Sequence, residues 1–185
     1  NDAAAYFKHL TRLRLDSLSG IDLVGEGRPQ ITRPGDKLWG PTTLPWMAFG
    51  YNIAIAPIQT LTLYNMVANN GVMMRPYLVN SIQEEGRIIK SITPKVYNAK
   101  VYSPATIKSA QIALEGVCIN GTGKSLFKNS PYKVAGKTGT ALVANGNKGY
   151  SDKIYQSSFA GYFPADNPQY TIVVIIKNKP HAYPF

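Results

Sequence analysis

The sequence of 185 residues is poor in the residue types that build disulfides, metal sites and membrane spans. Cys118 is the single cysteine, so neither a disulfide within the chain nor a cysteine-built zinc site can form. The two histidines, His9 and His181, lie far apart without partner motifs, and we expect ordinary structural positions for both. No apolar run approaches the roughly 20 residues of a transmembrane helix. We therefore expect no metal and no cofactor.

The two ends do not read as natural ends. The chain opens without Met or a signal peptide, and "NDAAAYFKHLTRL" already has helical spacing. At the other end, "NKPHAYPF" follows a strand-like run directly. We expect an excised piece of a longer protein, whose targeting segments lie outside these residues.

Acidic residues are scarce: 10 Asp and Glu stand against 20 Lys and Arg, which gives a net charge of +10. This charge favours anionic surroundings such as nucleic acid, anionic lipid or an acidic cell-wall polymer. The basic residues are scattered rather than striped along one helix, which favours a solvated basic surface and no nucleic-acid partner. A basic module that binds nucleic acid or another anionic polymer remains an alternative function.

Three stretches have the apolar spacing and end signals of helices. They are residues 2–15, a helix that begins at Pro57 and ends at "NNG", and a helix that begins at Ser103–Pro104 and ends at Asn120. Between the first two, residues 20–46 are rich in Gly and Pro and predict a long irregular segment.

The remaining stretches read as strands. Residues 77–83 and 87–92 flank "EEG" and predict a hairpin, and residues 132–143 predict a strand interrupted by glycines. Residues 155–163 and 170–178 are joined by a short connection that favours antiparallel pairing, and the second is apolar throughout, which predicts burial on both faces. The expected fold class is α+β, with an antiparallel sheet packed against helices.

The segment "NGTGKSLFKNSPYKVAGKTGT" (120–140) places Gly, Lys and a hydroxyl residue side by side twice. A phosphate-binding loop needs a glycine five residues before the glycine that precedes lysine, and here Cys118 and Pro131 occupy those positions. The first copy also follows a helix rather than a strand. We therefore interpret "GTGKS" as a flexible glycine connector and not as a nucleotide site.

The same segment contains Ser-x-x-Lys twice, at Ser125/Lys128 and Ser130/Lys133. This spacing brings a serine and a lysine base together only on a helical turn. Because we predict no helix at either place, we interpret both as chance occurrences.

The second copy, "GKTGT", lies in a predicted strand with glycines at 136 and 139, which suggests an edge that another backbone approaches closely. Lys137 would supply a fixed positive charge, and the hydroxyls of Thr138 and Thr140 could hold a carboxylate. Free backbone N–H groups could face a developing oxyanion. The alternative is an ordinary glycine-containing strand with an exposed lysine.

The surroundings of Lys-Thr-Gly-Thr extend this pattern. "LEGVCINGTG" precedes it and "SFAGYFPADNPQYTIVVII" follows it, while "GIDLVGE", "LPWMAFGYNIAIAPIQTLTLYNMVANNG" and "RPYLV" come earlier in the chain. In this order the segments resemble the C-terminal half of the transpeptidase domain of class B penicillin-binding proteins of the cell-division type. The resemblance covers nearly the whole chain. One departure is Ala56, where a threonine is expected before Pro57.

The resemblance implies a serine β-lactamase/transpeptidase-like fold and a serine D,D-transpeptidase of peptidoglycan synthesis. In that family a serine attacks the penultimate D-Ala carbonyl of a stem peptide, passes the acyl group to an amine, and is acylated by β-lactams. The carried-over catalytic residues are Lys137, which organises the site electrostatically, and Thr140, whose N–H is an oxyanion donor. Thr138, Gly139 and Thr140 are the substrate-binding residues.

The resemblance also implies a parent protein anchored in the inner membrane, facing the periplasm and working with division-site membrane proteins. The family places its Ser-x-x-Lys nucleophile and its Ser-x-Asn motif ahead of "GIDLVGE", and this chain has neither in that place. We therefore expect residues 1–185 to be a partial transpeptidase domain that is inactive alone. A non-catalytic penicillin-sensing relative is the alternative within the same family.

Overall fold

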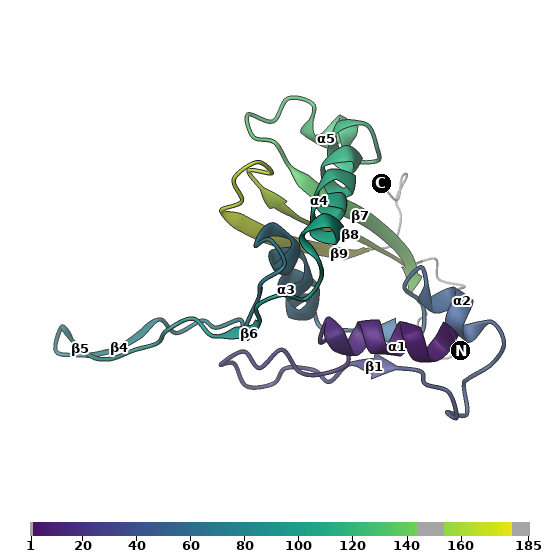
Figure 1. Ribbon diagram of the computed structural model, residues 1–185, viewed down its shortest axis with the longest axis horizontal. Helices are drawn as coiled ribbons and strands as arrows, with labels where there is room; N and C mark the ends of the chain where they lie inside the picture. Colours follow the sequence, from purple (N-terminus) through teal and green to yellow (C-terminus); the bar gives the residue numbers. More distant parts are fainter. Residues whose placement is uncertain (1, 144–153, 179–185) are drawn as a thin grey trace. The chain divides into compact units, whose positions relative to one another are not determined.

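The computed structural model describes residues 2–143 and 154–178 and confirms an α+β fold with antiparallel sheets (Figure 1). The helices are α1 Asp2–Arg12, α2 Thr43–Met47, α3 Pro57–Ala68, α4 Pro104–Ile119 and α5 Lys124–Phe127. The strands are β1 Gln30–Ile31, β2 Ile53–Ala54, β3 Met73–Met74, β4 Ser81–Glu84, β5 Arg87–Ser91, β6 Val96–Asn98, β7 Ala135–Val143, β8 Ile154–Phe163 and β9 Tyr170–Asn178. The chain forms two compact units: unit 1 is Asn1–Leu63 with Val72–Val101, and unit 2 is Tyr64–Gly71 with Tyr102–Phe185.

Unit 1 begins with α1, which ends three residues before the predicted end of this helix. Leu10 of α1 is buried, and the Tyr6 hydroxyl donates to the Met47 carbonyl at 3.0 Å, which ties α1 to α2. The predicted irregular segment 20–46 is confirmed except for the short β1 and the start of α2. These two elements were missed because two-residue strands and one-turn helices leave no periodic signal.

The start of α3 depends on a buried glutamine. Ala56, just before the helix, has no side-chain oxygen with which to cap it, but the Gln59 side chain accepts from the Ala56 N–H at 2.8 Å. The other end of the same amide donates to the carbonyls of Leu15 and Ser17 at 3.3 and 2.7 Å. Gln59 thus supplies the reciprocal half of a capping box, and it joins α3 to the segment after α1.

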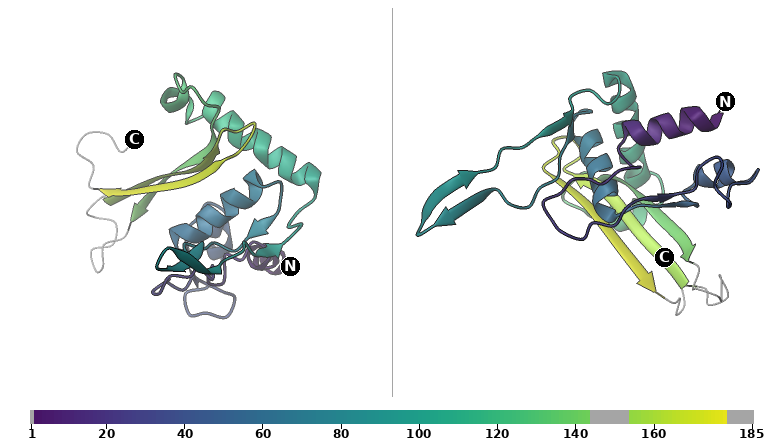
Figure 2. Two further views of the ribbon diagram at one scale, coloured as in Figure 1. Left: turned by 90° about the vertical axis from the view of Figure 1, so that its left-hand side faces the viewer. Right: turned by 90° about the horizontal axis from the view of Figure 1, so that it is seen from below.

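The predicted hairpin is confirmed as β4 and β5, which extend from the rest of unit 1 as a two-stranded arm (Figures 1 and 2). Glu85 and Gly86 both have positive φ, 48° and 79°, as a two-residue hairpin turn requires. The first strand begins at Ser81 rather than at residue 77, because the N–H groups of Leu78 and Val79 donate to the Asp22 carboxylate instead of a strand.

Unit 2 is built on the antiparallel sheet β7-β8-β9, whose two predicted C-terminal strands pair as expected. One face carries the buried Ala135 and Tyr162 and lies against helices: the Asn65 amide of α3 donates to the Thr171 hydroxyl at 3.3 Å. The Gln111 amide of α4 donates to the Val67 carbonyl at 3.0 Å, so α4 and the end of α3 hold each other over this face. The hydrophobic core of unit 2 therefore lies on one side of the sheet.

Two predicted helix ends in this unit are confirmed: the start of α4 and the end of α3. Ser103 is the N-cap of α4, with its hydroxyl accepting from the Thr106 N–H at 3.2 Å, and Pro104 is the first helical residue. At the end of α3, Gly71 has a φ of 90°, and its N–H donates to the Met66 carbonyl at 2.8 Å.

The prediction that residues 170–178 are buried on both faces is wrong. Ile172, Val174 and Ile176 share one face and are 38, 43 and 61% exposed, and Ile175 on the other face is 41% exposed. Among the described residues β9 pairs only with β8, so it is an edge strand with limited cover. An apolar run in the sequence indicates which residues can be buried, but it does not indicate whether another strand or helix covers them.

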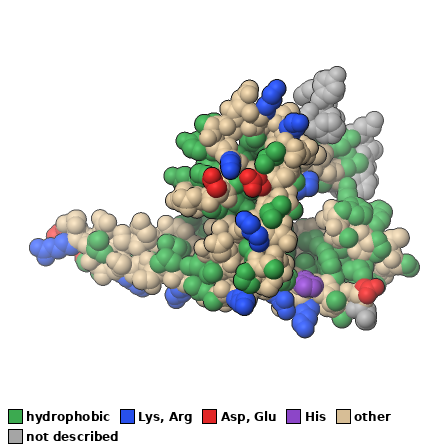
Figure 3. All heavy atoms as spheres, turned by 45° about the horizontal axis from the view of Figure 1, so that its top comes forward, with side chains coloured by type: hydrophobic (Ala, Val, Ile, Leu, Met, Phe, Trp, Pro, Cys, Tyr) green, Lys and Arg blue, Asp and Glu red, His purple; other side chains and the backbone are tan. Residues whose placement is uncertain are grey.

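Basic side chains lie dispersed over the face displayed in Figure 3 rather than in one stripe. Among the described residues, no helix is long and apolar enough to cross a membrane. Within the same residues, no three His, Cys, Asp or Glu side chains gather as metal ligands. His9 lies exposed on α1, and His181 lies outside the described residues.

Two glycines of unit 2 should respond to alanine in opposite directions. A Cβ at Gly161 would overlap the Ala135 carbonyl oxygen and lie 2.9 Å from the Gly136 Cα, and these backbone atoms cannot move aside. Gly161→Ala should therefore lower the free energy of unfolding by about 1–3 kcal/mol. A Cβ at Gly116, within α4, meets nothing within 4 Å. Gly116→Ala should therefore raise the free energy of unfolding by about 0.5–1 kcal/mol.

Denaturant unfolding of the protein that contains this chain measures both changes. Equal effects of the two substitutions would contradict the packing described for β7 and β8.

Tyr162 predicts a pH dependence of stability. Burial, and secondarily the negative charge of Glu115, raises the pKa of Tyr162 from 10.0 to about 12. A pKa that is higher in the folded state stabilises the protein fully below pH 10 and loses that effect as the pH rises towards 12. The stability of the wild type relative to Tyr162→Phe should therefore fall over this window. Denaturant unfolding of both proteins at a series of pH values measures this difference in stability. If the two stability curves stayed parallel between pH 10 and 12, the raised pKa of Tyr162 would be disproved.

Candidate functional site

The candidate site lies on β7, the other edge strand of the three-stranded sheet. Burial raises the pKa of the Cys118 thiol on α4, and a hydrogen bond from the Gly136 N–H opposes that rise. This N–H therefore points away from β8. Because residues two apart in a strand direct their N–H groups to the same side, those of Thr138 and Thr140 also face the free edge.

The positive charge and the hydroxyls meet at this edge although they start on opposite faces. The register pairs Thr138 with Phe159 and Thr140 with Ser157 on one face, while Lys137 lies on the other. The Lys137 Nζ nevertheless donates to the Thr138 carbonyl oxygen, and the distance between the two atoms is 2.8 Å. This carbonyl oxygen faces the free edge, as the Thr138 N–H does. The long lysine side chain thus bends around the edge of the strand.

A groove of about 710 Å³ lies beside Thr138, Gly139 and Thr140. Hydroxyl groups from β7, β8 and the loop before α5 line part of it, and apolar side chains line the rest. The hydroxyl residues are Thr122, Ser125, Thr138, Thr140, Ser157 and Ser158, and the apolar ones are Leu126, Phe159, Val174 and Ile176. Hydroxyl donors beside an apolar wall suit a ligand with a carboxylate and a short aliphatic part.

The two Gly-Lys stretches of the sequence meet in this groove. The Thr122 hydroxyl of the first stretch lies 2.7 Å from the Thr138 hydroxyl of the second. The first stretch is a hydrogen-bonded turn and not the flexible connector predicted: the Gly123 N–H donates to the Val117 carbonyl at 3.0 Å. A Cβ at Gly121 would lie 2.9 Å from the same carbonyl, so glycine lets the turn pack against the end of α4.

The first Ser-x-x-Lys does lie on a helix, contrary to the prediction. Ser125 belongs to α5, Lys128 is the residue that ends it, and Ser125 lines the groove. The nearby Pro131 obscured this single turn in the sequence. Ser130, by contrast, forms a tight turn with Tyr132, donating to its carbonyl at 2.8 Å and accepting from its N–H at 3.2 Å.

The glycines of β7 mark close approaches, as predicted, but the approaching groups belong to β8. A Cβ at Gly136 would overlap the Phe159 ring and lie 2.6 Å from the Ala160 carbonyl oxygen. A Cβ at Gly139 would lie 2.6 Å from the Ser158 hydroxyl. Both glycines therefore serve the pairing within the sheet. Sequence reasoning missed the contributions of Ser158 and Phe159 because no register could be assigned before the pairing was known.

Comparison with known proteins places this arrangement in a family. A family model described as the penicillin binding protein transpeptidase domain matches residues 4–184. The chain is 38% identical over 141 residues to "Peptidoglycan D,D-transpeptidase FtsI homolog" of Mesostigma viride, an alignment that covers 70% of this chain and 23% of that protein. It is 32% identical over 174 residues to "Stage V sporulation protein D" of Bacillus subtilis, an alignment that covers 93% of this chain and 26% of that protein.

A solved structure has the same fold. Penicillin binding protein 3 of Mycobacterium tuberculosis, complexed with aztreonam, superposes with a TM-score of 0.79 at 28% identity, covering 97% of this chain and 41% of that one. The chain spans about a quarter of the length of the two curated relatives.

The contact between the two Gly-Lys stretches can be tested by a double-mutant cycle. Thr122→Ala and Thr138→Ala should show a coupling energy of about 0.5–1.5 kcal/mol in unfolding experiments, because each removes the same hydrogen bond. Thr140→Ala is the matched control, since Thr140 lies two residues further along the same face. Its coupling to Thr122→Ala should be close to zero, and equal coupling in the two cycles would argue against a specific contact.

Proposed function

From the fact that this chain belongs to the penicillin-binding protein transpeptidase family, we propose that it is part of a D,D-transpeptidase that cross-links peptidoglycan stem peptides through a serine acyl-enzyme. The observation that carries the proposal is the free edge of β7. There a lysine ammonium, two threonine hydroxyls and two outward N–H groups lie beside one groove. This set of donors fits a substrate that carries a carboxylate next to a reacting carbonyl.

In the proposed complex a stem peptide ending in D-Ala-D-Ala lies along the edge of β7. The hydroxyls of Thr138 and Thr140 hold its terminal carboxylate, and the N–H of Thr140 donates to the oxyanion that forms at the attacked carbonyl. Losing one such donor typically costs about 10² to 10³ in kcat. Gly139 keeps the backbone between the two threonines close to β8, and Lys137 stabilises negative charge at the edge.

The nucleophilic serine is proposed to come from a part of the longer protein that these residues do not include. Residues 1–185 then form a partial transpeptidase domain, which supplies the edge that binds the substrate. The fact that the chain spans about a quarter of its relatives supports this division. We expect the chain alone to be inactive.

The setting proposed for the protein is septal cell-wall synthesis at the periplasmic face of the inner membrane. The relative from Mesostigma viride, a peptidoglycan D,D-transpeptidase by name, supports the assignment to cell-wall synthesis. The relative complexed with aztreonam supports β-lactams as ligands of the same edge. Division-site membrane proteins are the expected partners, and turnover with a stem peptide and an amine acceptor separates a transpeptidase from a penicillin-sensing relative.

The role of Lys137 is tested by acylation with a fluorescent penicillin. In the full-length protein, Lys137→Ala should slow labelling by two or more orders of magnitude, because the edge loses its fixed positive charge. Lys128→Ala is the matched control, since Lys128 is exposed, ends α5 and is not among the residues that line the groove. Near-normal labelling of Lys137→Ala would reduce Lys-Thr-Gly-Thr to a structural motif.

Ser125→Ala tests the location of the nucleophile. Of the serines that line the groove, Ser125 is the one that begins a Ser-x-x-Lys on a helix, so it is the candidate nucleophile of this chain if the proposal is wrong. The full-length Ser125→Ala variant should label like the wild type, and residues 1–185 alone should not label. Stoichiometric labelling of the chain alone would overturn the proposal.

A further inference from the structure

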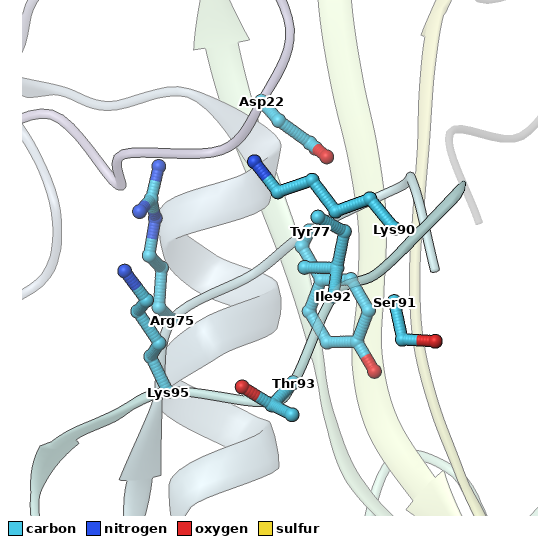
Figure 4. Close-up of a pocket in the computed structure, with 8 residues that line it drawn as sticks. All are labelled: Asp22, Arg75, Tyr77, Lys90, Ser91, Ile92, Thr93 and Lys95. Carbon is cyan, nitrogen blue, oxygen red and sulfur yellow. The ribbon is translucent and has the colours of Figure 1, made fainter. Parts of the chain in front are cut away.

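A second polar cavity, of about 300 Å³, lies in unit 1 beside β5 (Figure 4). It is formed by the loop that holds Asp22, by the segment after β3, and by the segment from β5 to β6. The side chains that matter for its chemistry are Asp22, Arg75, Tyr77, Lys90, Thr93 and Lys95. We call this cavity the basic pocket. It shares no residue with the groove beside β7, which belongs to unit 2.

Three cationic side chains converge on the basic pocket. The Arg75 N–H donates to the Lys95 carbonyl at 2.8 Å, so the two residues are neighbours on paired segments, and Figure 4 shows their side chains pointing the same way. Lys90 enters from β5. Like charges on neighbouring strands repel each other. Among the described residues, none of the three has a carboxylate oxygen within 4.0 Å.

The single carboxylate of the pocket is already engaged. Asp22 accepts from the N–H groups of Leu78 at 2.7 Å and Val79 at 3.0 Å. These two hydrogen bonds, and to a lesser degree the charge of Arg75, lower the pKa of Asp22, so the group is ionised at neutral pH. Three cations and one carboxylate leave a formal charge of +2 at the pocket.

The wall that carries Arg75 is formed before any ligand arrives. Arg75 is half-buried, and its Nε donates to the Gly20 carbonyl at 2.6 Å, which leaves the two terminal nitrogens of the guanidinium for another acceptor. The Tyr97 hydroxyl donates to the neighbouring Ser19 carbonyl at 2.8 Å. The Arg14 guanidinium lies over the Tyr97 ring, 4.1 Å from its centroid. Such fixed donors lower the entropic cost of binding an anion.

We propose that the basic pocket binds a phosphate group. A phosphate monoester or inorganic phosphate carries nearly two negative charges, which matches the formal charge of the pocket, whereas a carboxylate carries one. Its oxygens can accept from the planar guanidinium of Arg75 and the ammonium groups of Lys90 and Lys95, which lie toward the same end of the pocket in Figure 4. Either a soluble phosphate or a phospholipid whose headgroup is a phosphate monoester can supply this group, and the site lies beyond the proposed transpeptidase function.

The test uses the full-length protein with two probes. Inorganic phosphate is titrated by calorimetry at constant ionic strength. Co-sedimentation compares vesicles that contain phosphatidic acid, whose headgroup is a phosphate monoester, with vesicles of phosphatidylcholine alone. We expect saturable binding of at least one anionic probe. The double variant Lys90→Gln/Lys95→Gln should weaken that binding about tenfold or more, because two charge-assisted hydrogen bonds are lost.

The control is the double variant Lys37→Gln/Lys100→Gln, which removes the same charge from exposed lysines of unit 1 outside the pocket. It should bind like the wild type, and the thermal unfolding midpoint should be unchanged in both variants. Binding of phosphate alone assigns a soluble ligand, and binding of phosphatidic acid vesicles alone assigns a lipid headgroup. Absence of binding in both arms, or equal weakening in the control, would overturn the proposal.

Discussion

The pairing of β7 with β8 is the constraint on which the candidate site depends. Because β8 occupies one side of β7, the N–H and carbonyl groups of Thr138 are directed to the other side, and the Lys137 ammonium follows them. The pairing is close enough to require glycine at Gly136 and Gly161, which face each other in the register. Gly136, one of the two glycines that suggested a ligand edge in the sequence, therefore helps that edge to form through its pairing with β8.

A second layer of contacts holds the edge from outside the sheet. The turn that follows α4 packs against its last residues and brings Thr122 to Thr138, while Phe127 of α5 packs against Phe159 of β8 with ring centroids 5.2 Å apart. Cys118, the one cysteine of the sequence, accepts the Gly136 N–H and so helps to position the start of β7. Covalent chemistry at this edge would then need only a nucleophile, which we propose comes from elsewhere in the longer protein.

The two units concentrate different kinds of polar chemistry. The groove of unit 2 combines hydroxyls with an apolar wall, and the Lys137 ammonium lies at the neighbouring edge of β7, as expected for recognition of a peptide terminus. The basic pocket of unit 1 combines three cations with an engaged carboxylate, as expected for an anion of higher charge. Basic side chains are dispersed over the face displayed in Figure 3, so the convergence of Arg75, Lys90 and Lys95 is a local feature that the net charge of +10 could not reveal.

Local sequence by itself determined much of the secondary structure and the class of site. Ser103–Pro104, "NNG" and Glu85–Gly86 set helix ends and a turn through short-range capping and positive φ, and Lys-Thr-Gly-Thr in its context indicated the family. Only the tertiary structure decided what neighbours each residue has. It showed β9 as an exposed edge, placed Thr122 against Thr138, and brought Arg75 beside Lys95, because these outcomes depend on contacts between segments distant in the sequence.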